Sequence, residues 1–298
     1  MNSTNKAYLY AGLAVFFWST VATAFKIALR ALDFVQLIFY ASVVTVIVLF
    51  VILLVQNKTK HVFRQSTGEV IQSLFLGAFN PLFYYLVLFK AYSLLPAQLA
   101  QPLNMVWPIV LALLSVPFLG QKIGKRSIGA LFISFTGVIF ISSQGGLKGF
   151  ENTNFYVVSL ALGSSILWSL YWIFSVRDKR DPIVKLFMNF LAGAILLTFA
   201  VILFSDFRVD WGPSFYAAVY VGIFEVGITY VLWLKAMEYS TNNAKIGNLV
   251  FLAPFISLIF IRFILKETIF ITTFIGLVFI VTGILVQQTD RKKKEPAQ

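Results

Sequence analysis

Cysteine is absent from this 298-residue chain, and histidine occurs once, as His61. Without cysteine, the chain has no disulfides, no thiolate nucleophiles and no thiolate metal ligands. His61 lies among Lys58, Lys60 and Arg64 in a polar segment, so a histidine-based metal site or a Ser-His nucleophile cannot be assembled. The sequence therefore predicts no metal, no cofactor and no enzymatic activity.

Charge is also scarce, because only 12% of the residues are charged while 59% are hydrophobic. The mean hydropathy is +0.85. A soluble domain of this length cannot bury so much apolar surface and still cover itself with polar groups. Hydrocarbon as the surrounding solvent removes this problem. The composition therefore predicts an integral membrane protein in contact with the lipid bilayer.

Ten apolar segments are long enough to cross about 30 Å of hydrocarbon. They lie at residues 7–29, 34–55, 70–92, 95–118, 127–145, 154–176, 183–204, 213–236, 244–265 and 269–288. The connections between them are short, and no soluble domain fits anywhere in the chain. We expect ten transmembrane helices.

The basic residues predict the orientation of these spans. When loops are assigned alternately to the two sides, most of the 24 Lys and Arg residues fall on the side of the amino terminus. Cytoplasmic loops carry such an excess, so we expect a multi-pass protein of the cell membrane with both termini in the cytoplasm. The net charge of +12 then serves topology and contact with anionic headgroups, and we expect no nucleic-acid partner.

The two halves of the chain repeat one order of polar and small residues. Matching pairs are Trp18/Trp168, Ser19/Ser169, Gly77/Gly222, Phe79/Phe224, Tyr85/Tyr230, Lys90/Lys235, Pro108/Pro254 and Gly137/Gly283. Five spans per half is an odd number, which places the halves in opposite orientations across the membrane. We therefore predict an all-α integral membrane protein of ten transmembrane helices, built as two inverted five-helix repeats. The predicted repeats cover 1–146 and 154–290, with a linker at 147–153 and a basic cytoplasmic tail at 291–298.

Short motifs recur near the end of the third span, within the fourth span and just after the fourth span of each half. They are Phe89-Lys90-Ala91, Leu103-Asn104-Met105-Val106-Trp107-Pro108 and Phe118-Leu119-Gly120-Gln121-Lys122, echoed by Leu234-Lys235-Ala236, Ala253-Pro254 and Leu265-Lys266-Glu267. Over essentially the whole chain this pattern resembles the drug/metabolite transporter superfamily, EamA type. The Asn-x-x-Trp-Pro and Gly-Gln-Lys motifs are most similar to its aromatic amino-acid exporters. Tyr40 and Asn189 depart from the family, replacing the arginine usual early in the second helix of each half, and Gln121 replaces the usual acid.

Glu225 is the acidic residue farthest from any predicted span end. With Thr229 and Trp233 it forms an i, i+4, i+8 stripe on one helical face. Its repeat mate is Asn80, which lies with Tyr84 on the equivalent face of the third span. A buried carboxylate there can serve as a proton-coupling group or as the counter-ion of a substrate amine. A hydrogen-bonded structural role is the alternative.

Amides and aromatic rings provide the other candidate substrate contacts. Gln98, Gln101 and Asn104 lie within one third of the circumference of span four, beside Trp107. Amides suit zwitterions or polar metabolites, although hydrogen bonding between helices around a proline kink is an equal alternative. The predicted substrate-binding residues are Trp18, Asn80, Tyr84, Gln101, Asn104, Trp107, Trp168, Glu225, Thr229 and Trp233. The tryptophans can also serve packing alone.

Lys26 ends a polar face of the first span. It can attract an anionic group at the mouth of the protein or extend to the membrane interface. Inverted repeats are the plan of secondary transporters, so we expect alternating access at a midplane site, with export of amino acids or related polar metabolites. The alternatives are a receptor or scaffold, and a carrier of phosphorylated or nucleotide-type metabolites. Expected partners are a small-molecule substrate and the candidate coupling ion H⁺, in a monomer or homodimer.

Overall fold

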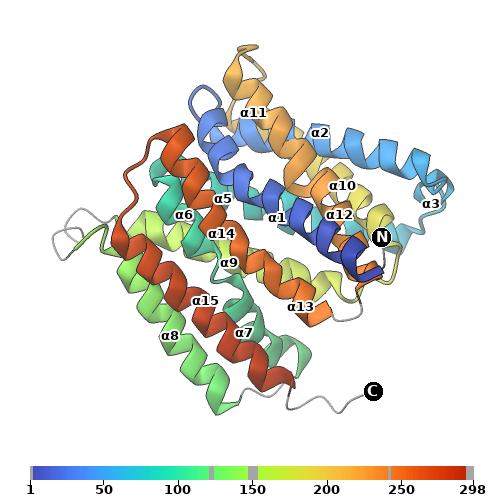
Figure 1. Ribbon diagram of the computed structural model, residues 1–298. Coiled ribbons are helices and arrows are strands. Elements are labelled where there is room, and N and C mark those ends of the chain that lie inside the picture. Colours follow the sequence, from blue (N-terminus) through green and yellow to red (C-terminus); the bar gives the residue numbers. More distant parts are fainter. Residues whose placement is uncertain (1–2, 121–123, 147–153, 241–242, 293–298) are drawn as a thin grey trace.

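The computed structural model describes residues 3–120, 124–146, 154–240 and 243–292, and within these ranges the chain forms helices and no strands. The predicted linker at 147–153 and the basic tail after residue 292 lie outside the described residues, as do Gln121 and Lys122. The first described helix begins and the last described helix ends on one side of the bundle (Figure 1). We refer to that side as the terminal face and to the other as the opposite face.

The described residues of the first half form nine helical segments. They are α1 (Ser3–Ala28), α2 (Phe34–Val55), α3 (Thr59–Val62), α4 (Thr67–Gly77), the π-helical η1 (Ala78–Phe83), α5 (Tyr84–Leu94), α6 (Ala97–Asn104), α7 (Trp107–Leu119) and α8 (Lys125–Ser142). The long helices are continuous apolar runs, and α3 is a single turn in the polar connection after α2.

The second half repeats this order with different breaks. Its segments are α9 (Phe155–Ser175), α10 (Pro182–Phe204), α11 (Pro213–Val221), the π-helical η3 (Gly222–Gly227), α12 (Ile228–Tyr239), α13 (Asn243–Asn248), the 3₁₀ turn η4 (Leu249–Leu252), α14 (Ala253–Phe260), the π-helical η5 (Ile261–Leu265) and α15 (Ile271–Lys292).

Helices occupy all ten predicted spans. Over the residues that the structure describes, eight of them are long and apolar enough to cross a membrane, and shorter apolar helices at Ile128–Ser142 and Ile271–Val286 occupy the remaining two places. Because helices satisfy their own backbone hydrogen bonds, such segments are stable in hydrocarbon. The predicted fold class, an all-α integral membrane protein, is confirmed.

The second helix of each half begins at an aspartate. Asp33 accepts hydrogen bonds from the amides of Val35 and Gln36 at the start of α2. Asp181 accepts from the amides of the second and third residues of α10, which begins at Pro182. A carboxylate here satisfies amides that have no partner within the helix, and it interacts favourably with the helix dipole. The two caps fix the same chain reversal on opposite faces of the membrane.

The third span of each half is interrupted at the same place. In the first half the backbone of Asn80 is not helical, with φ −144° and ψ 114°, and the following Pro81 lacks the amide that would continue the helix. In the second half the interruption is η3, which contains Glu225. These breaks were not predicted, and they place the repeat mates Asn80 and Glu225 in irregular backbone. The fourth span is also interrupted, between α6 and α7, just before Pro108.

Contacts between the halves follow a pseudo-two-fold pattern. The first helix α1 packs against α11, η3 and α12, while its mate α9 packs against η1 and α5. The second helices, α2 and α10, pack on each other. Gly77 of α4 meets α10, where an added Cβ would lie 2.5 Å from the Asn189 carbonyl oxygen. Its mate Gly222 meets α2, where an added Cβ would lie 2.5 Å from the Ala41 carbonyl oxygen.

The last helices, α8 and α15, run side by side at the edge of the bundle (Figure 1). A Cβ on Gly137 would lie 2.5 Å from the Gly276 carbonyl oxygen, and the reverse distance is also 2.5 Å. Seven residues earlier on α8, Ala130 lies opposite Gly283, seven residues later on α15. This register makes the two helices antiparallel. Helices at equivalent places in the two halves therefore point in opposite directions, as inverted repeats require.

The close approach of α8 and α15 makes a stability prediction. Gly276→Ala places a methyl group against the rigid backbone at Gly137, so we expect a loss of about 1–3 kcal/mol. Gly129→Ala on α8 is the control, because an added Cβ there meets nothing within 4 Å. That change should be neutral or stabilising by about 0.5–1 kcal/mol. Thermal unfolding of the purified protein measures both, and equal effects of the two changes would contradict the assigned packing.

Candidate functional site

Glu225 lies where the two halves meet. Its carboxylate Oε1 accepts a hydrogen bond of 3.0 Å from the hydroxyl of Tyr85, which belongs to the other half. Its Oε2 is buried and has no hydrogen-bond partner among the described residues. An unpartnered carboxylate oxygen in a membrane interior is costly, so it points to a proton or a bound group as its partner.

A small cavity borders this carboxylate. It has a volume of about 10 Å³, and its lining includes Ser42 and Thr45 of α2, Tyr85 and Glu225. The Ser42 hydroxyl also lacks a partner among the described residues. Thr45 donates to the Gly222 carbonyl at 2.8 Å and so ties α2 to η3. A cavity of this size is just large enough for one water molecule.

The predicted stripe of Glu225, Thr229 and Trp233 is divided by η3. The Thr229 hydroxyl donates a hydrogen bond to the backbone carbonyl of Phe224, five residues earlier. It thereby satisfies a carbonyl whose regular helical hydrogen bond is disturbed by the π-helical turn. The Trp233 ring lies 5.3 Å from the Trp18 ring. Trp18 donates its indole N–H to the backbone carbonyl of Glu225 at 3.0 Å. The structure thus brings Trp18, Trp233 and Glu225 together, and Thr229 supports the local backbone.

A second group of predicted residues surrounds Trp168 of α9. The Tyr84 ring lies 4.7 Å from the Trp168 ring, and Trp107 approaches it edge-on at 6.5 Å. The Tyr84 hydroxyl donates to Asn104 Oδ1 at 3.4 Å, and Asn104 Nδ2 donates to the Ser164 hydroxyl at 2.8 Å. Aromatic and amide groups of the first half therefore meet α9 of the second half at this site.

Adjacent tyrosines connect the two groups, because the Tyr84 and Tyr85 rings lie 4.6 Å apart. Gln101 lies on α6, and its side-chain Oε1 is buried without a hydrogen-bond partner among the described residues. Asn80 is buried in the η1 break.

The sequence did not lead us to select Tyr85 and Ser164 as site residues. The repeat match of Tyr85 with Tyr230 was the signal that could have identified Tyr85.

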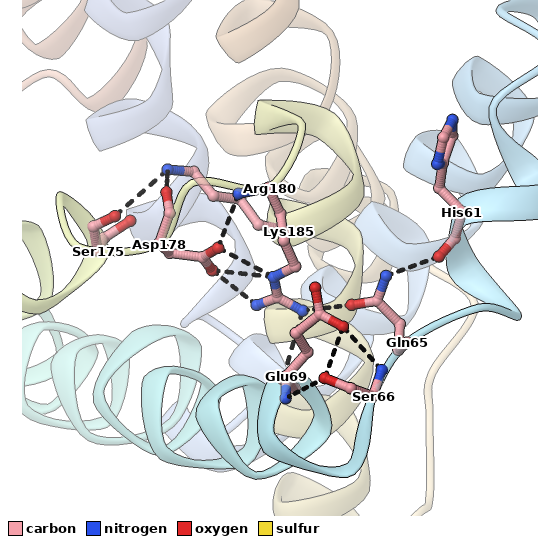
Figure 2. Close-up of polar contacts among 8 residues, drawn as sticks. All are labelled: His61, Gln65, Ser66, Glu69, Ser175, Asp178, Arg180 and Lys185. Atoms are coloured by element: carbon pink, nitrogen blue, oxygen red, sulfur yellow. Dashed lines mark hydrogen bonds and ion pairs between the residues drawn. The ribbon is translucent and has the colours of Figure 1, made fainter.

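A charged network lies on the terminal face, between the connection after α2 and the connection after α9. Arg180 pairs with Asp178 at 2.6 Å, and both side chains are largely buried. Arg180 also donates to Gln65 Oε1 at 2.6 Å and to the Glu69 carbonyl, as Figure 2 shows. Lys58 pairs with Asp181 at 2.6 Å nearby. These contacts join the two halves on this face.

On the opposite face, the start of α2 and the loop after α10 are joined by hydrogen bonds. Gln36 Nε2 donates to Asp206 Oδ1 at 3.0 Å and to the Arg208 carbonyl at 3.1 Å. The cap Asp33 accepts from the hydroxyl of Ser205. Each of the two aspartate caps therefore contacts the loop of the other half on its own face. Such contacts join the halves on both faces.

The sequence profile of the EamA-like transporter family matches residues 5–143 and 155–287. An uncharacterised transporter of Archaeoglobus fulgidus is 25% identical over 95% of this chain and 97% of its own length. YvbV of Bacillus subtilis, also an uncharacterised transporter, is 24% identical over 68% of this chain and 67% of its own length.

Another similar protein is the aromatic amino acid exporter YddG of Ancylobacter novellus. It is 27% identical over 61% of this chain, and the match spans 62% of its own length. A solved crystal structure of a protein shares the fold, with a TM-score of 0.67 and 23% identity. That likeness covers 98% of this chain and 99% of the other.

Proposed function

Because this chain belongs to the EamA-like transporter family, we propose that it is a secondary transporter that exports amino acids, with aromatic ones as the preferred cargo. The observation that carries this proposal is the carboxylate of Glu225, held by Tyr85 of the other half and left with one unpartnered buried oxygen. Inverted-repeat transporters bind cargo and coupling ions near the midplane between their repeats, which supports this role for Glu225. The family assignment makes this multi-pass membrane protein a transporter.

The preference for aromatic cargo rests on the rings around Trp168. Tyr84, Trp107 and Tyr171 surround it, with the Tyr171 ring stacked at 5.7 Å. Rings in offset or edge-on geometry bind another aromatic ring favourably. Asn104 lies beside them and offers both donors and acceptors to a zwitterion. One similar protein is named an aromatic amino acid exporter, which supports the same cargo class.

Alternating access requires that each face opens in turn. We propose that the Arg180 network closes the terminal face and that the Gln36 and Asp33 contacts close the opposite face. Cargo binding would then shift the balance between the two states through its differential affinity for them. The basic residues favour the cytoplasm as the compartment of the terminal face and the cell membrane as the location.

The cargo proposal predicts a binding defect in Trp168→Ala. Loss of the indole ring removes stacking, so we expect the affinity for L-phenylalanine to fall about five- to tenfold, or about 1–1.4 kcal/mol. Ligand-induced thermal stabilisation of the purified protein measures this affinity. The matched control is Trp211→Ala, because Trp211 is 73% exposed before α11. If L-phenylalanine stabilised Trp168→Ala as much as the unaltered protein, the aromatic site would be contradicted. If only phosphorylated metabolites stabilised the protein, the cargo would be phosphorylated metabolites and not amino acids.

A further inference from the structure

A second pocket lies on the opposite face, where helices of both halves end. It has a volume of about 190 Å³ and is lined by Lys26, Leu29, Arg30, Ser93, Leu265 and Glu267. Arg30 and Ser93 are exposed at its mouth, whereas Lys26 and Glu267 are only partly exposed. This volume far exceeds the roughly 10–15 Å³ that a single water molecule needs on the same measure. The pocket is therefore large enough for a small organic molecule.

Lys26 is held within the protein and does not extend away from it. Its Nζ donates to the carbonyl of Tyr92 at 2.8 Å and to the carbonyl of Leu95 at 3.1 Å. Both carbonyls lie at the carboxyl end of α5, which favours a cation. An ammonium group has three N–H donors, so one remains for a ligand. The two hydrogen bonds fix its position before a ligand arrives.

The carboxylate of Glu267 accepts hydrogen bonds from backbone amides of the other half. Its Oε1 accepts from the amide of Ala97 at 3.0 Å, and its Oε2 accepts from the amide of Gln98 at 3.2 Å. These amides begin α6, whose dipole further compensates the negative charge. Glu267 therefore fastens the second half to the first, and both of its carboxylate oxygens already accept hydrogen bonds.

The charges around the pocket do not cancel. Lys26 and Arg30 supply two cations against the single carboxylate of Glu267. The side chain of Arg30 has no hydrogen-bond or ion-pair partner among the described residues, so its planar fork of donors is available. A guanidinium group binds a carboxylate through two parallel hydrogen bonds, and a nearby fixed ammonium strengthens the attraction. The pocket thus has the chemistry of an anion site.

We propose that this pocket binds the carboxylate of a small organic acid or amino acid, as a peripheral site separate from the one around Glu225 and Trp168. Arg30 would receive the carboxylate at the mouth, and the third N–H of Lys26 would bind it at the floor. Binding itself stands apart from the proposed transport function. The further idea, that cargo passes through this pocket on the opposite face, rests on that function.

Three small probes separate the parts of an amino acid. L-Phenylalanine has both charged groups, 3-phenylpropanoate lacks the amine, and 2-phenylethylamine lacks the carboxylate. Isothermal titration of the full-length protein in neutral detergent measures the affinity for each. We expect 3-phenylpropanoate to bind, with a loss of about tenfold or more in Arg30→Gln, and 2-phenylethylamine to show no dependence on Arg30.

Matched variants show whether 3-phenylpropanoate binds in this pocket or elsewhere. Lys26→Gln should weaken 3-phenylpropanoate binding too, but it also removes the contacts to α5, so Arg30→Gln is the principal variant. Lys90→Gln is the control, because Lys90 lies over the Phe34 ring at 4.9 Å and is not part of the pocket. Glu225→Gln should retain 3-phenylpropanoate binding, which separates this site from the transport site.

Three results would overturn the proposal. They are absence of 3-phenylpropanoate binding to the unaltered protein, equal binding to Arg30→Gln, and loss of binding when phosphatidylglycerol is added to the detergent. The last result would identify a phospholipid phosphate as the occupant. Failure of transport with retained, Arg30-dependent binding would contradict the transport function and leave the anion site standing.

Discussion

Glu225→Gln is expected to reduce transport driven by a proton gradient at least about tenfold while leaving exchange of cargo intact. Glutamine keeps the shape of glutamate and can still accept a hydrogen bond from Tyr85, but it cannot take up or release a proton. The unpartnered Oε2 beside a cavity of about 10 Å³ gives that proton its position. Tenfold corresponds to about 1.4 kcal/mol.

The experiment compares two assays on the same proteoliposomes. Uptake after a pH jump measures coupled transport, and exchange at equal pH measures movement of cargo without net proton transfer. Glu238→Gln is the control, because Glu238 is exposed on α12, near the end of the same span. Unchanged pH-driven uptake in Glu225→Gln would remove Glu225 from coupling. Loss of both activities together with cargo binding would instead assign Glu225 as the counter-ion of the substrate amine.

Arg180→Ala is expected to destabilise the protein by about 3 kcal/mol, the lower end of the range for breaking a buried ion pair. The change leaves the carboxylate of Asp178 buried without its partner, and only 1% of that side chain is exposed. It also removes the hydrogen bonds to Gln65 and Glu69 that join the halves on the terminal face. Thermal or denaturant unfolding of the purified protein measures the loss.

The control for Arg180 is its neighbour Arg177, an exposed side chain with one hydrogen bond of 3.2 Å to the Phe118 carbonyl. Arg177→Ala should change the free energy of unfolding by at most about 0.5 kcal/mol, as for ordinary surface substitutions. Replacing both partners, Asp178→Asn with Arg180→Ala, should recover part of the loss. Equal stability of Arg177→Ala and Arg180→Ala would contradict the network.

The same pair makes a pH prediction. Burial alone would raise the pKa of Asp178, but the hydrogen bonds and charge of Arg180 outweigh it and hold this pKa below its ordinary value of 3.8. Because the folded-state pKa is lowered, the stabilisation is fully present above the unfolded value and is lost as the pH falls through the folded one. Arg180→Ala should therefore reduce the acid sensitivity of unfolding in that range.

Sequence alone predicted the fold because its signals extend over whole helices. Apolar runs located ten spans, and pairs such as Gly77/Gly222 and Gly137/Gly283 located the repeat. The breaks at Asn80 and Glu225 were not predicted, since a π-helical turn depends on packing against α10 and α2 and has weak local sequence signals. The partnership of Tyr85 with Glu225 likewise arises only when the two halves meet.

Packing also determined which predicted contacts formed. Trp18, Trp107 and Trp168 were selected as single residues, and their neighbours, the rings of Trp233 and Tyr84, depend on how α1 and α9 cross the other half. Periodicity placed Thr229 beside Glu225, but the π-helical turn between them changed the register. The sequence left open whether Lys26 faces solvent or protein. In the structure it faces the protein, because its ammonium group donates to backbone carbonyls at the end of α5.

Counterflow in proteoliposomes tests the transporter proposal most directly. Vesicles loaded with unlabelled L-phenylalanine and placed in a trace of labelled L-phenylalanine should accumulate the label transiently above its equilibrium level. The accumulation should saturate with concentration, because alternating access admits one cargo at a time through a binding site. A channel would give no accumulation above equilibrium, and a receptor or scaffold would give no protein-dependent entry of label. Either result, obtained across the amino acids, would contradict the account.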